Sequence, residues 1–341
     1  MYWDMEHTAD YQCLFNFIMG IRGCGKTYTS LKTCIKWYLK SLTNKISEPQ
    51  RFLYLRRRKT ELDDLTSGRK ETNKLFAKVQ SEFPGVEIYA EGNVLYCNDE
   101  VMGWAQSLST ATARKSIPYP GVRNIIFDEF VIDDTGNYKY LKDETIKFFE
   151  FYETVSRDSD PRVWFLANAL SQVNPYFVEF NIYAPSQGIK RFGKNKDILV
   201  EMVAPEDMIE RKKNTRFGQL IEGSSYEGYA VENKWLMDSN ALLGKKPRSA
   251  KYYCTLHYND KNIGIWIDPK TQCLYASFNV DLQCPHEFAC TDKDHKANIN
   301  LIRNMRTIPY LRTISTMFDH GALLCENLEI KNYMFDIMRR R

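Results

Sequence analysis

Short apolar segments alternate with amphipathic segments along the first 200 residues. Four segments are apolar and rich in β-branched or aromatic residues, which predicts buried strands at 14–19, 51–58, 122–130 and 162–170. Residues 28–42 predict a helix, and so do residues 145–157, where apolar side chains recur at 146, 149, 152 and 155. Strands that alternate with helices predict an α/β fold with a parallel-type sheet covered by helices.

The pattern changes between and after these segments. A long polar helix, interrupted near Ser67, is predicted between residue 59 and Pro84, and 86–108 predicts short strands of an inserted edge hairpin. From about residue 185 the chain is polar, basic and glycine-containing, and 251–278 then predicts three strands before a helix-rich end. We therefore expect a first domain over 1–197, a linker over 198–228 and a smaller α+β domain over 229–341.

The end of the first predicted strand carries a phosphate-loop pattern. GIRGCGKT (20–27) fits G-x-x-x-x-G-K-[ST], with a strand before it and a helix after it. Lys26 would reach the β- and γ-phosphates of a nucleotide, and the Thr27 hydroxyl would bind Mg²⁺. The residues expected to bind the nucleotide around this loop are Gly20, Arg22, Gly23, Cys24, Gly25, Lys26, Thr27 and Tyr28.

The strand at 122–130 supplies the acidic partner that a phosphate loop needs. Asp128 and Glu129 follow NIIF at its carboxyl end, where α/β sheets place their ligands. Asp128 would bind Mg²⁺ through its water shell, and Glu129 would orient and polarise the attacking water. The 102 residues between Lys26 and Asp128 (128 − 26) leave room for another strand between the two motif strands. This order indicates ATP and the ATPase branch that includes helicases and translocases.

Three further positions have both a catalytic and an ordinary interpretation. Asn168 closes an apolar strand, where it would bind the γ-phosphate or the water, or would simply turn the chain. Arg157 precedes a proline-containing loop and is either an arginine finger supplied to a neighbouring subunit or a solvated side chain. Residues 108–120 resemble a flexible lid carrying Arg114 and Lys115, or an ordinary basic loop.

Composition sets limits on the class of protein. The chain has 341 residues, 43% of them hydrophobic, and a formal net charge of only +4, so a nucleic-acid role needs clustered basic residues. Nine scattered cysteines indicate a reducing compartment. No apolar run approaches the roughly 18 residues that a membrane span needs, and the amino-terminal segment has no secretion pattern. We expect a cytosolic protein with no membrane partner.

Several longer segments together resemble the DNA-packaging ATPases of phi29-like phages. They are GIRGCGKTY, YLRRRKTEL, KSIPYPGVRNIIFDEF, ETVSRD, NALSQVNPYF and RKKNTRFGQLIEG, in this order. The resemblance covers roughly the first 270 residues well. It implies an additional-strand catalytic-glutamate ATPase that forms a homomeric, pentameric ring at the portal of an empty prohead and pumps double-stranded DNA inward. It also implies a location in the host cytoplasm and at the portal vertex, and absence from the finished virion.

The same resemblance implies roles for individual residues. Lys26, Thr27, Asp128 and Glu129 would carry hydrolysis, Arg157 would act in trans, and Lys115 would be a lid lysine that helps nucleotide exchange. The carboxyl-terminal domain would be a degenerate RNase H-like nuclease fold that contacts DNA and the packaging RNA. Asp260 and Asp268 are either a remnant of its site or ordinary turn residues. One departure is the acidic VIDDTGN after the acidic strand, which weighs against DNA contact there.

Clusters of basic residues are the candidates for contact with the phosphate backbone of DNA or RNA, because such contacts do not depend on the base sequence. Each cluster is either a DNA- or RNA-binding surface or a solvated face. The clusters contain Arg56, Arg57, Arg58 and Lys59, then Lys190, Arg191, Lys194 and Lys196, then Arg211, Lys212 and Lys213, and the tail ending in Arg339, Arg340 and Arg341. A zinc site from Cys284, His286, Cys290 and His295 has no common spacing and is disfavoured.

Two other functions remain open at this point. One is a packaging terminase large subunit whose nuclease is active. The other is a nucleotide-switched scaffold, in which ATP assembles a complex without sustained turnover.

Overall fold

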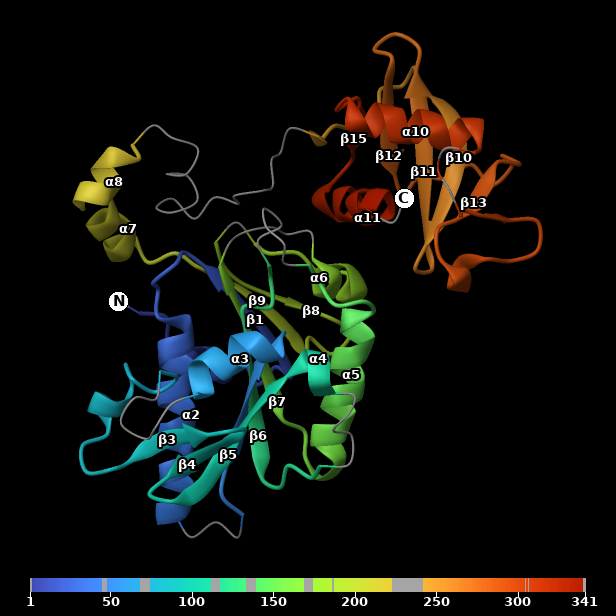
Figure 1. The fold of residues 1–341 in the computed structure, drawn as a ribbon. Helices are drawn as coiled ribbons and strands as arrows, with labels where there is room; N and C mark the ends of the chain where they lie inside the picture. The colour runs from blue at the N-terminus through green and yellow to red at the C-terminus, as the bar shows by residue number, and fades with distance from the viewer. Residues whose placement is uncertain are drawn as a thin grey trace. The chain divides into compact units, whose positions relative to one another are not determined.

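A nine-stranded sheet forms the centre of the amino-terminal part of the chain (Figure 1). Its strand order is β3-β4-β5-β2-β6-β7-β1-β9-β8, in which the six strands from β5 to β9 are mutually parallel, while β4 pairs antiparallel with β3 and β5, and β8 pairs antiparallel with β9. The strands are β1 Phe15–Gly20, β2 Arg51–Arg56, β3 Ile88–Glu91, β4 Val94–Cys97, β5 Glu100–Ser107, β6 Val122–Asp128, β7 Arg162–Asn168, β8 Gly188–Phe192 and β9 Ile198–Val203. The predicted α/β fold with a parallel-type sheet is confirmed.

The computed structural model describes residues 2–44, 48–67, 74–111, 117–132, 139–168, 174–185, 187–222, 242–303, 305 and 307–339. The chain divides into an amino-terminal unit, Met1–Ser171 with Ala184–Met237, and a carboxyl-terminal unit, Gln172–Tyr183 with Asp238–Arg341. In these described ranges, no helix has the length and apolar character that crossing a bilayer requires.

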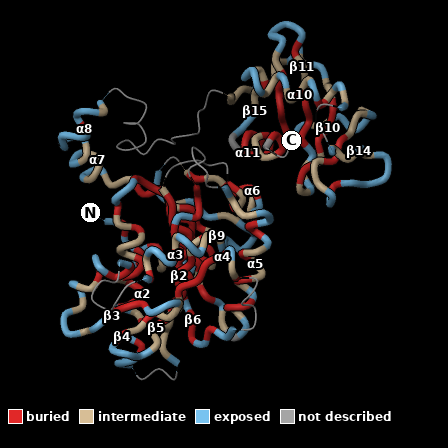
Figure 2. Tube along the Cα trace, in the orientation of Figure 1, coloured by how far each residue is buried: buried red, intermediate tan, exposed pale blue. Residues whose placement is uncertain are grey.

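Helices cover both faces of the large sheet, which explains why its central strands are apolar throughout (Figures 1 and 2). On one face α2 (Lys26–Thr43) buries Leu31, Ile35 and Tyr38 against the strands. On the other face α5 (Glu144–Val155) places Phe148 in an aromatic cluster with Phe127 and with Phe15, Phe17 and Phe165. Shorter helices are α1 (Met5–Ala9), α3 (Lys59–Thr66), α4 (Leu108–Ala111), α7 (Glu206–Lys213) and α8 (Arg216–Leu220), and η4 (Ser156–Asp158) follows α5.

The strand that separates the two motif strands is β7. It pairs in parallel with β1 on one side, where Asn168 is opposite Gly20, and with β6 on the other, where Leu166 is opposite Asp128. A strand between the two motif strands was expected, but it was expected to come from the residues between Lys26 and Asp128. β7 follows both motifs in sequence. The segment between the motifs instead forms β2 to β5 on the far side of β6.

Two predicted boundaries are wrong. The expected linker began at residue 198, but Ile198–Val203 is β9, which pairs in parallel with β1 and so belongs to the sheet. The expected long helix ends at Thr66 as α3, in agreement with the interruption predicted near Ser67, but residues 74–79 do not continue it to Pro84, because they form turns before the short η2 (Gln80–Glu82). The predicted edge hairpin is present: β3 and β4 pair antiparallel at the edge of the sheet, and β5 connects them to the main sheet by pairing in parallel with β2.

A six-stranded sheet, ordered β14-β13-β10-β11-β12-β15, forms the carboxyl-terminal unit. The three predicted strands are confirmed as β10 (Lys251–Tyr258), β11 (Lys261–Asp268) and β12 (Cys273–Ser277), all antiparallel to their neighbours in this trio. Three short strands follow, so the end of the chain is less helical than predicted: β13 (Glu287–Ala289), β14 (Asn300–Leu301) and β15 (Leu323–Cys325). Helices α10 (Pro309–Asp319) and α11 (Leu328–Arg339) bury apolar side chains against the sheet, and α6 (Pro175–Phe180) groups with this unit.

Arg57 does not lie on a nucleic-acid-binding surface. Its side chain is 1% exposed, and its guanidinium donates to the Glu144 carboxylate at 2.9 Å and to the backbone carbonyls of Glu129 and Phe130. The rings of Tyr140 and Phe127 lie against its guanidinium, with ring centroids 5.0 and 5.8 Å from Arg57 Cζ. The sequence prediction is therefore corrected: Arg57 fixes the chain just after β6.

Replacing Arg57 tests this structural role. Arg57→Leu leaves Glu144 as an unpaired buried carboxylate, so the free energy of unfolding should fall by about 3–5 kcal/mol in urea denaturation. Arg57→Met with Glu144→Leu should recover much of this loss, because both buried charges are then removed. Lys59→Gln on the exposed start of α3 is the control and should change stability by no more than about 0.5 kcal/mol. Equal stabilities for the Arg57 and Lys59 variants would contradict the assignment.

Candidate nucleotide-binding site

A cavity of about 810 Å³ opens at the carboxyl ends of β1, β2, β6 and β7. It joins the phosphate loop, the acidic strand end and Asn168, which are far apart in sequence. Its lining residues include Tyr2, Arg22, Gly23, Gly25, Lys26, Thr27, Tyr28, Tyr54, Arg56, Lys74, Lys78, Asp128, Glu129 and Asn168. This volume lies in the range of ligand-binding clefts.

The bend of the phosphate loop depends on glycine at two positions for different reasons. Gly25 has φ +85° at the start of α2, and a Cβ there would lie 2.8 Å from the Tyr2 ring. Gly20 ends β1 so close to β9 that a Cβ would lie 2.2 Å from the carbonyl oxygen of Val203. The loop is thus enclosed by the amino-terminal segment and by β9, and α2 begins directly after it, so its free N–H groups face an anion site.

Lys26 is buried inside this loop, with 8% exposure. Its ammonium donates to the carbonyl oxygens of Gly20 and Ile21 at 3.2 and 3.1 Å, and to Asn168 Oδ1 at 3.2 Å. It also lies 3.4 Å from Cys24 Sγ. These contacts hold the positive charge at the point where loop and β7 meet, next to the N–H groups of α2.

Thr27 and Asp128 meet across the cavity. The Thr27 hydroxyl donates to the Asp128 carboxylate, with Oγ1 3.1 and 3.2 Å from its two oxygens. The Tyr54 hydroxyl, from β2, donates to Asp128 Oδ2 at 2.8 Å. A hydroxyl and a carboxylate are oxygen ligands of the kind Mg²⁺ prefers, so this pair fits the expected metal position.

Glu129 follows Asp128 in a left-handed backbone conformation (φ +56°), which turns its side chain away from the strand direction. The carboxylate is 63% exposed and pairs with Arg56 Nη2 at 3.0 Å. Arg56 Nη1 also lies 3.5 Å from Asp128 Oδ2. One guanidinium from the end of β2 therefore contacts both acids.

The charges of this cluster follow from its burial. Burial acts to lower the pKa of Arg56, but the nearby carboxylates of Asp128, Glu129 and Glu61 oppose it, so the pKa is raised and the side chain is a cation. Burial raises the pKa of Tyr54 well above its ordinary value, and the neighbouring Asp128 adds to this. Tyr54 is thus a neutral donor to Asp128.

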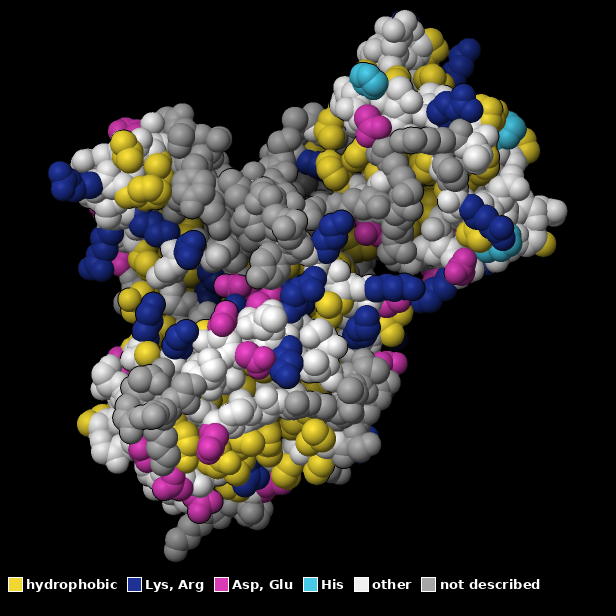
Figure 3. Space-filling view, viewed as in Figure 1, with side chains coloured by type: hydrophobic (Ala, Val, Ile, Leu, Met, Phe, Trp, Pro, Cys, Tyr) yellow, Lys and Arg dark blue, Asp and Glu magenta, His cyan; other side chains and the backbone are white. Residues whose placement is uncertain are grey.

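The structure gathers most of the predicted nucleotide and metal residues at this cavity, but not all predicted site residues. Arg157 is exposed on η4, before the start of β7 and hence at the opposite end of the sheet. Lys115 and Arg114 lie outside the described residues. Lys59, Lys190, Arg191, Lys194 and Lys196 are exposed, and Arg58 is half-buried and donates to the Lys139 carbonyl. Figure 3 shows more Lys and Arg side chains over α3, α7 and α8 than over β3 to β5.

The two acids considered as a nuclease remnant lie at a strand end and in a turn: Asp268 is the last residue of β11, and Asp260 is a turn residue. Asp268 is 1% exposed and accepts hydrogen bonds from Ser249 Oγ, Thr271 N and Thr271 Oγ1. Asp260 lies in the turn between β10 and β11 with φ +59°. Within the described part of the chain, no three His, Cys, Asp or Glu side chains are grouped to hold a metal ion.

Sequence reasoning missed several residues of the cavity. Tyr54 and Arg56 alternate along β2 and so share a face at its carboxyl end, a signal that the strand pattern contains. Tyr2, Lys74 and Lys78 had no such signal, because only tertiary folding brings their segments to the phosphate loop.

Lys212 is a further cation near the phosphate loop, and it comes from α7. Its pKa is lowered by burial and by the neighbouring positive charges of Lys26 and Arg22, although Cys24 acts in the opposite direction. Three basic side chains that repel one another at a phosphate loop are stabilised when an anion binds between them. Lys212 is therefore close enough to the phosphate loop to act on its charges, although it is not among the described residues that line the cavity.

A phosphate loop between β1 and α2, an acidic end on β6 and an additional strand between them define the class of phosphate-loop α/β proteins. The family model described as Podovirus DNA encapsidation protein (Gp16) matches residues 1–341. The chain belongs to this family, and the resemblance to phi29-like packaging proteins is confirmed.

Individual relatives agree with this assignment over the whole chain. The DNA packaging proteins of Bacillus phages PZA and phi29 are each 30% identical over 341 residues, covering 100% of this chain and 98% of theirs. The chain is similar to a protein in the phi29 viral genome packaging motor assembly, with a TM-score of 0.72, 30% identity and 99% of both chains covered. The N-terminal domain of the phi29 DNA packaging ATPase matches with a TM-score of 0.52 and 31% identity, covering 60% of this chain and 98% of that domain.

Lys212→Gln should weaken binding of a nonhydrolysable ATP analogue about fivefold, as loss of one partly screened charge predicts. Because its pKa is lowered, Lys212 loses its proton at a lower pH than an ordinary lysine, so the difference from wild type should shrink toward alkaline pH. Lys213→Gln, on the adjacent exposed residue, is the matched control in calorimetric titrations at several pH values. A Lys212 variant that binds like the Lys213 variant would place Lys212 outside the site.

Proposed function

We propose that this chain is the motor subunit that drives double-stranded viral DNA into an empty prohead by ATP hydrolysis. The observation that carries the proposal is the meeting of Thr27 and Asp128 at 3.1 Å, with Glu129 beside them and Lys26 in the same cavity. Family membership supports the coupling to DNA packaging, since the relatives are described as DNA packaging proteins and as a packaging ATPase.

The residues of the cavity divide the hydrolytic work. Lys26 binds the β- and γ-phosphates, and Asn168, which already contacts Lys26, hydrogen-bonds the γ-phosphate or the water. Thr27 and Asp128, the latter through water, would hold Mg²⁺, which would supply positive charge next to the phosphates. Glu129 orients the attacking water and accepts its proton. While Glu129 is paired with Arg56, it is held away from this role, so Arg56 governs when the base is available.

Hydrolysis also draws on a neighbouring subunit. The seven residues of β7 span about 23 Å, and they separate Arg157 at one end from Asn168 and the phosphate loop at the other. Arg157 is therefore badly placed for its own nucleotide and suited to the nucleotide of an adjacent copy in a homomeric, pentameric ring at the portal. Lys115, from the lid, would assist nucleotide exchange in this ring.

Nucleic-acid contacts would come from the exposed basic residues and from the carboxyl-terminal unit. Lys59, Lys190, Arg191 and Lys194 are exposed and Arg58 is half-buried. These residues remain candidates for contact with the phosphate backbone of DNA or RNA. The mixed six-stranded sheet with α10 and α11 on one face supports a degenerate RNase H-like domain that contacts the packaging RNA. We propose that the protein acts in the host cytoplasm at the portal vertex and is absent from the finished virion.

Glu129→Gln separates a motor from a scaffold. The variant should bind ATP with wild-type affinity, but hydrolysis should fall by about 10²–10⁴-fold because the water loses its base, and DNA packaging should stop. Phosphate release and DNA protection inside proheads measure the two effects, with Glu153→Gln on α5 as the control. Packaging that persists without hydrolysis would favour the nucleotide-switched scaffold. Metal-dependent cleavage of plasmid DNA by the wild type would instead favour a terminase with an active nuclease.

Mixing of subunits tests Arg157. Arg157→Ala should abolish hydrolysis in a uniform ring, whereas Glu129→Gln subunits mixed with Arg157→Ala subunits should recover part of it. Recovery is expected because a Glu129→Gln subunit supplies Arg157 to a neighbour that has an intact Glu129. Rates that never exceed the sum of the two separate variants would exclude action in trans.

A further inference from the structure

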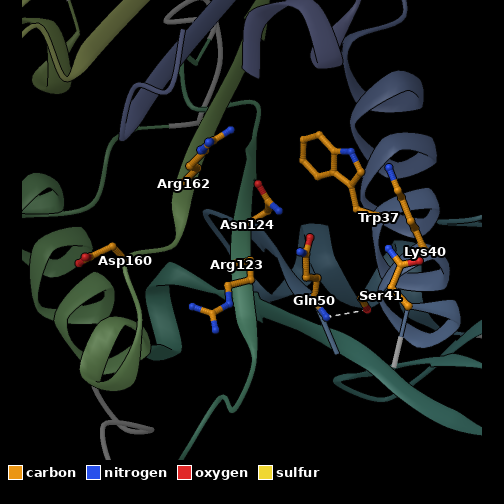
Figure 4. A pocket seen from close by; sticks show the side chains of 9 residues that line it. Trp37, Lys40, Ser41, Gln50, Arg123, Asn124, Asp160 and Arg162 are labelled. Carbon is orange, nitrogen blue, oxygen red and sulfur yellow. Dashed lines mark hydrogen bonds between the residues drawn. The ribbon is translucent and has the colours of Figure 1, made fainter. Parts of the chain in front are cut away.

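A second cavity lies at the opposite end of the large sheet from the phosphate loop (Figure 4). It has a volume of about 440 Å³ and is formed by the last turns of α2 together with the amino-terminal ends of β2, β6 and β7. All of these elements are parts of the packed α/β core, so the cavity has a fixed framework. Ser41 Oγ strengthens this framework by accepting from Gln50 N at 2.9 Å while donating to the Tyr38 carbonyl.

The charges around this cavity favour an anionic ligand. Among the described residues that line it are three cations, Lys40, Arg123 and Arg162, and one acid, Asp160. Arg162 is oriented by a hydrogen bond from Nη1 to the Ala9 carbonyl at 3.1 Å. Arg123 approaches Glu48 only at 3.8 Å, with about half of each side chain exposed, so this pair is weak and leaves Arg123 able to meet a phosphate.

The remaining lining groups suit a nucleobase. In Figure 4 Trp37 and Asn124 face one another across the cavity, and Gln50 lies beside them. Asn124 is 5% exposed, and its Oδ1 accepts from Trp164 Nε1 at 3.0 Å, which leaves its Nδ2 as the group to donate into the cavity. An indole stacks on any base, and amides hydrogen-bond base edges.

From this combination we propose that the cavity binds one unpaired nucleotide of a single-stranded nucleic acid. The base stacks on Trp37 and meets Asn124 and Gln50, while Arg123 and Lys40 contact the flanking phosphates. A duplex does not fit, because its bases are stacked and paired and their faces are not available. An acidic peptide would use the cations but gains nothing specific from an indole opposite an amide.

The test is binding of a short, fluorescently labelled, unstructured single-stranded RNA, and of DNA with the same sequence, measured by anisotropy on the full chain. Trp37→Ala should weaken binding about tenfold, and Trp37→Phe should retain most of it because stacking survives. Arg123→Gln should weaken binding and reduce the salt slope by about one. Lys36→Gln, on the same helix but paired with Glu6, is the matched control.

ATP hydrolysis measured in parallel keeps this proposal separate from the proposed function. The variants should hydrolyse ATP like the wild type, since none lies at the phosphate loop. Trp37→Ala that binds like Lys36→Gln, or competition by a duplex as strong as by the single strand, would overturn the proposal. Displacement of the single strand by polyglutamate with the same dependence on Trp37 would also overturn it and would indicate a protein partner.

Discussion

The hydrogen bond between Thr27 and Asp128 depends on three parallel strands that end at the same level. β7 lies between β1, which leads into the phosphate loop and Thr27, and β6, which ends at Asp128; Asn168 is opposite Gly20 and Leu166 is opposite Asp128. A slip of one residue in either pairing would turn the side chains of a strand to the other face of the sheet. The apolar residues that fill both faces prevent such a slip, so the packing of the core sets the geometry of the site.

Two neighbouring arginines, the last residue of β2 and the one after it, show how strand alternation divides electrostatic roles. Arg56 faces the cavity and contacts Asp128 and Glu129, whereas Arg57 is buried and pairs with Glu144. Arg57 also donates to the Glu129 carbonyl, so it fixes the backbone whose acidic side chain Arg56 holds. The proposed catalytic base, Glu129, is thus held at its backbone by Arg57 and at its carboxylate by Arg56.

The large sheet has two chemically different ends. Its carboxyl ends present the phosphate loop and acids, as expected for parallel strands, and its amino ends present Arg157 and the cavity at Trp37. If both proposals hold, nucleotide turnover and contact with other molecules occur at opposite ends of one rigid element. Shifts at one end would then reach the other through the strands themselves.

The sequence alone determined the phosphate loop, the acidic strand end and the parallel-type sheet, because these depend on local spacing and on apolar periodicity. The sequence pattern puts Lys26 and Thr27 in the phosphate loop and Asp128 and Asn168 at strand ends, and all four residues line one cavity. Only the tertiary structure decided that β7 is the intervening strand, that β9 completes the sheet and that Arg57 is buried while Lys212 is near the loop. Those outcomes depend on which distant segments pack together, and the charge of a lysine or arginine does not reveal whether its side chain meets solvent or a buried carboxylate.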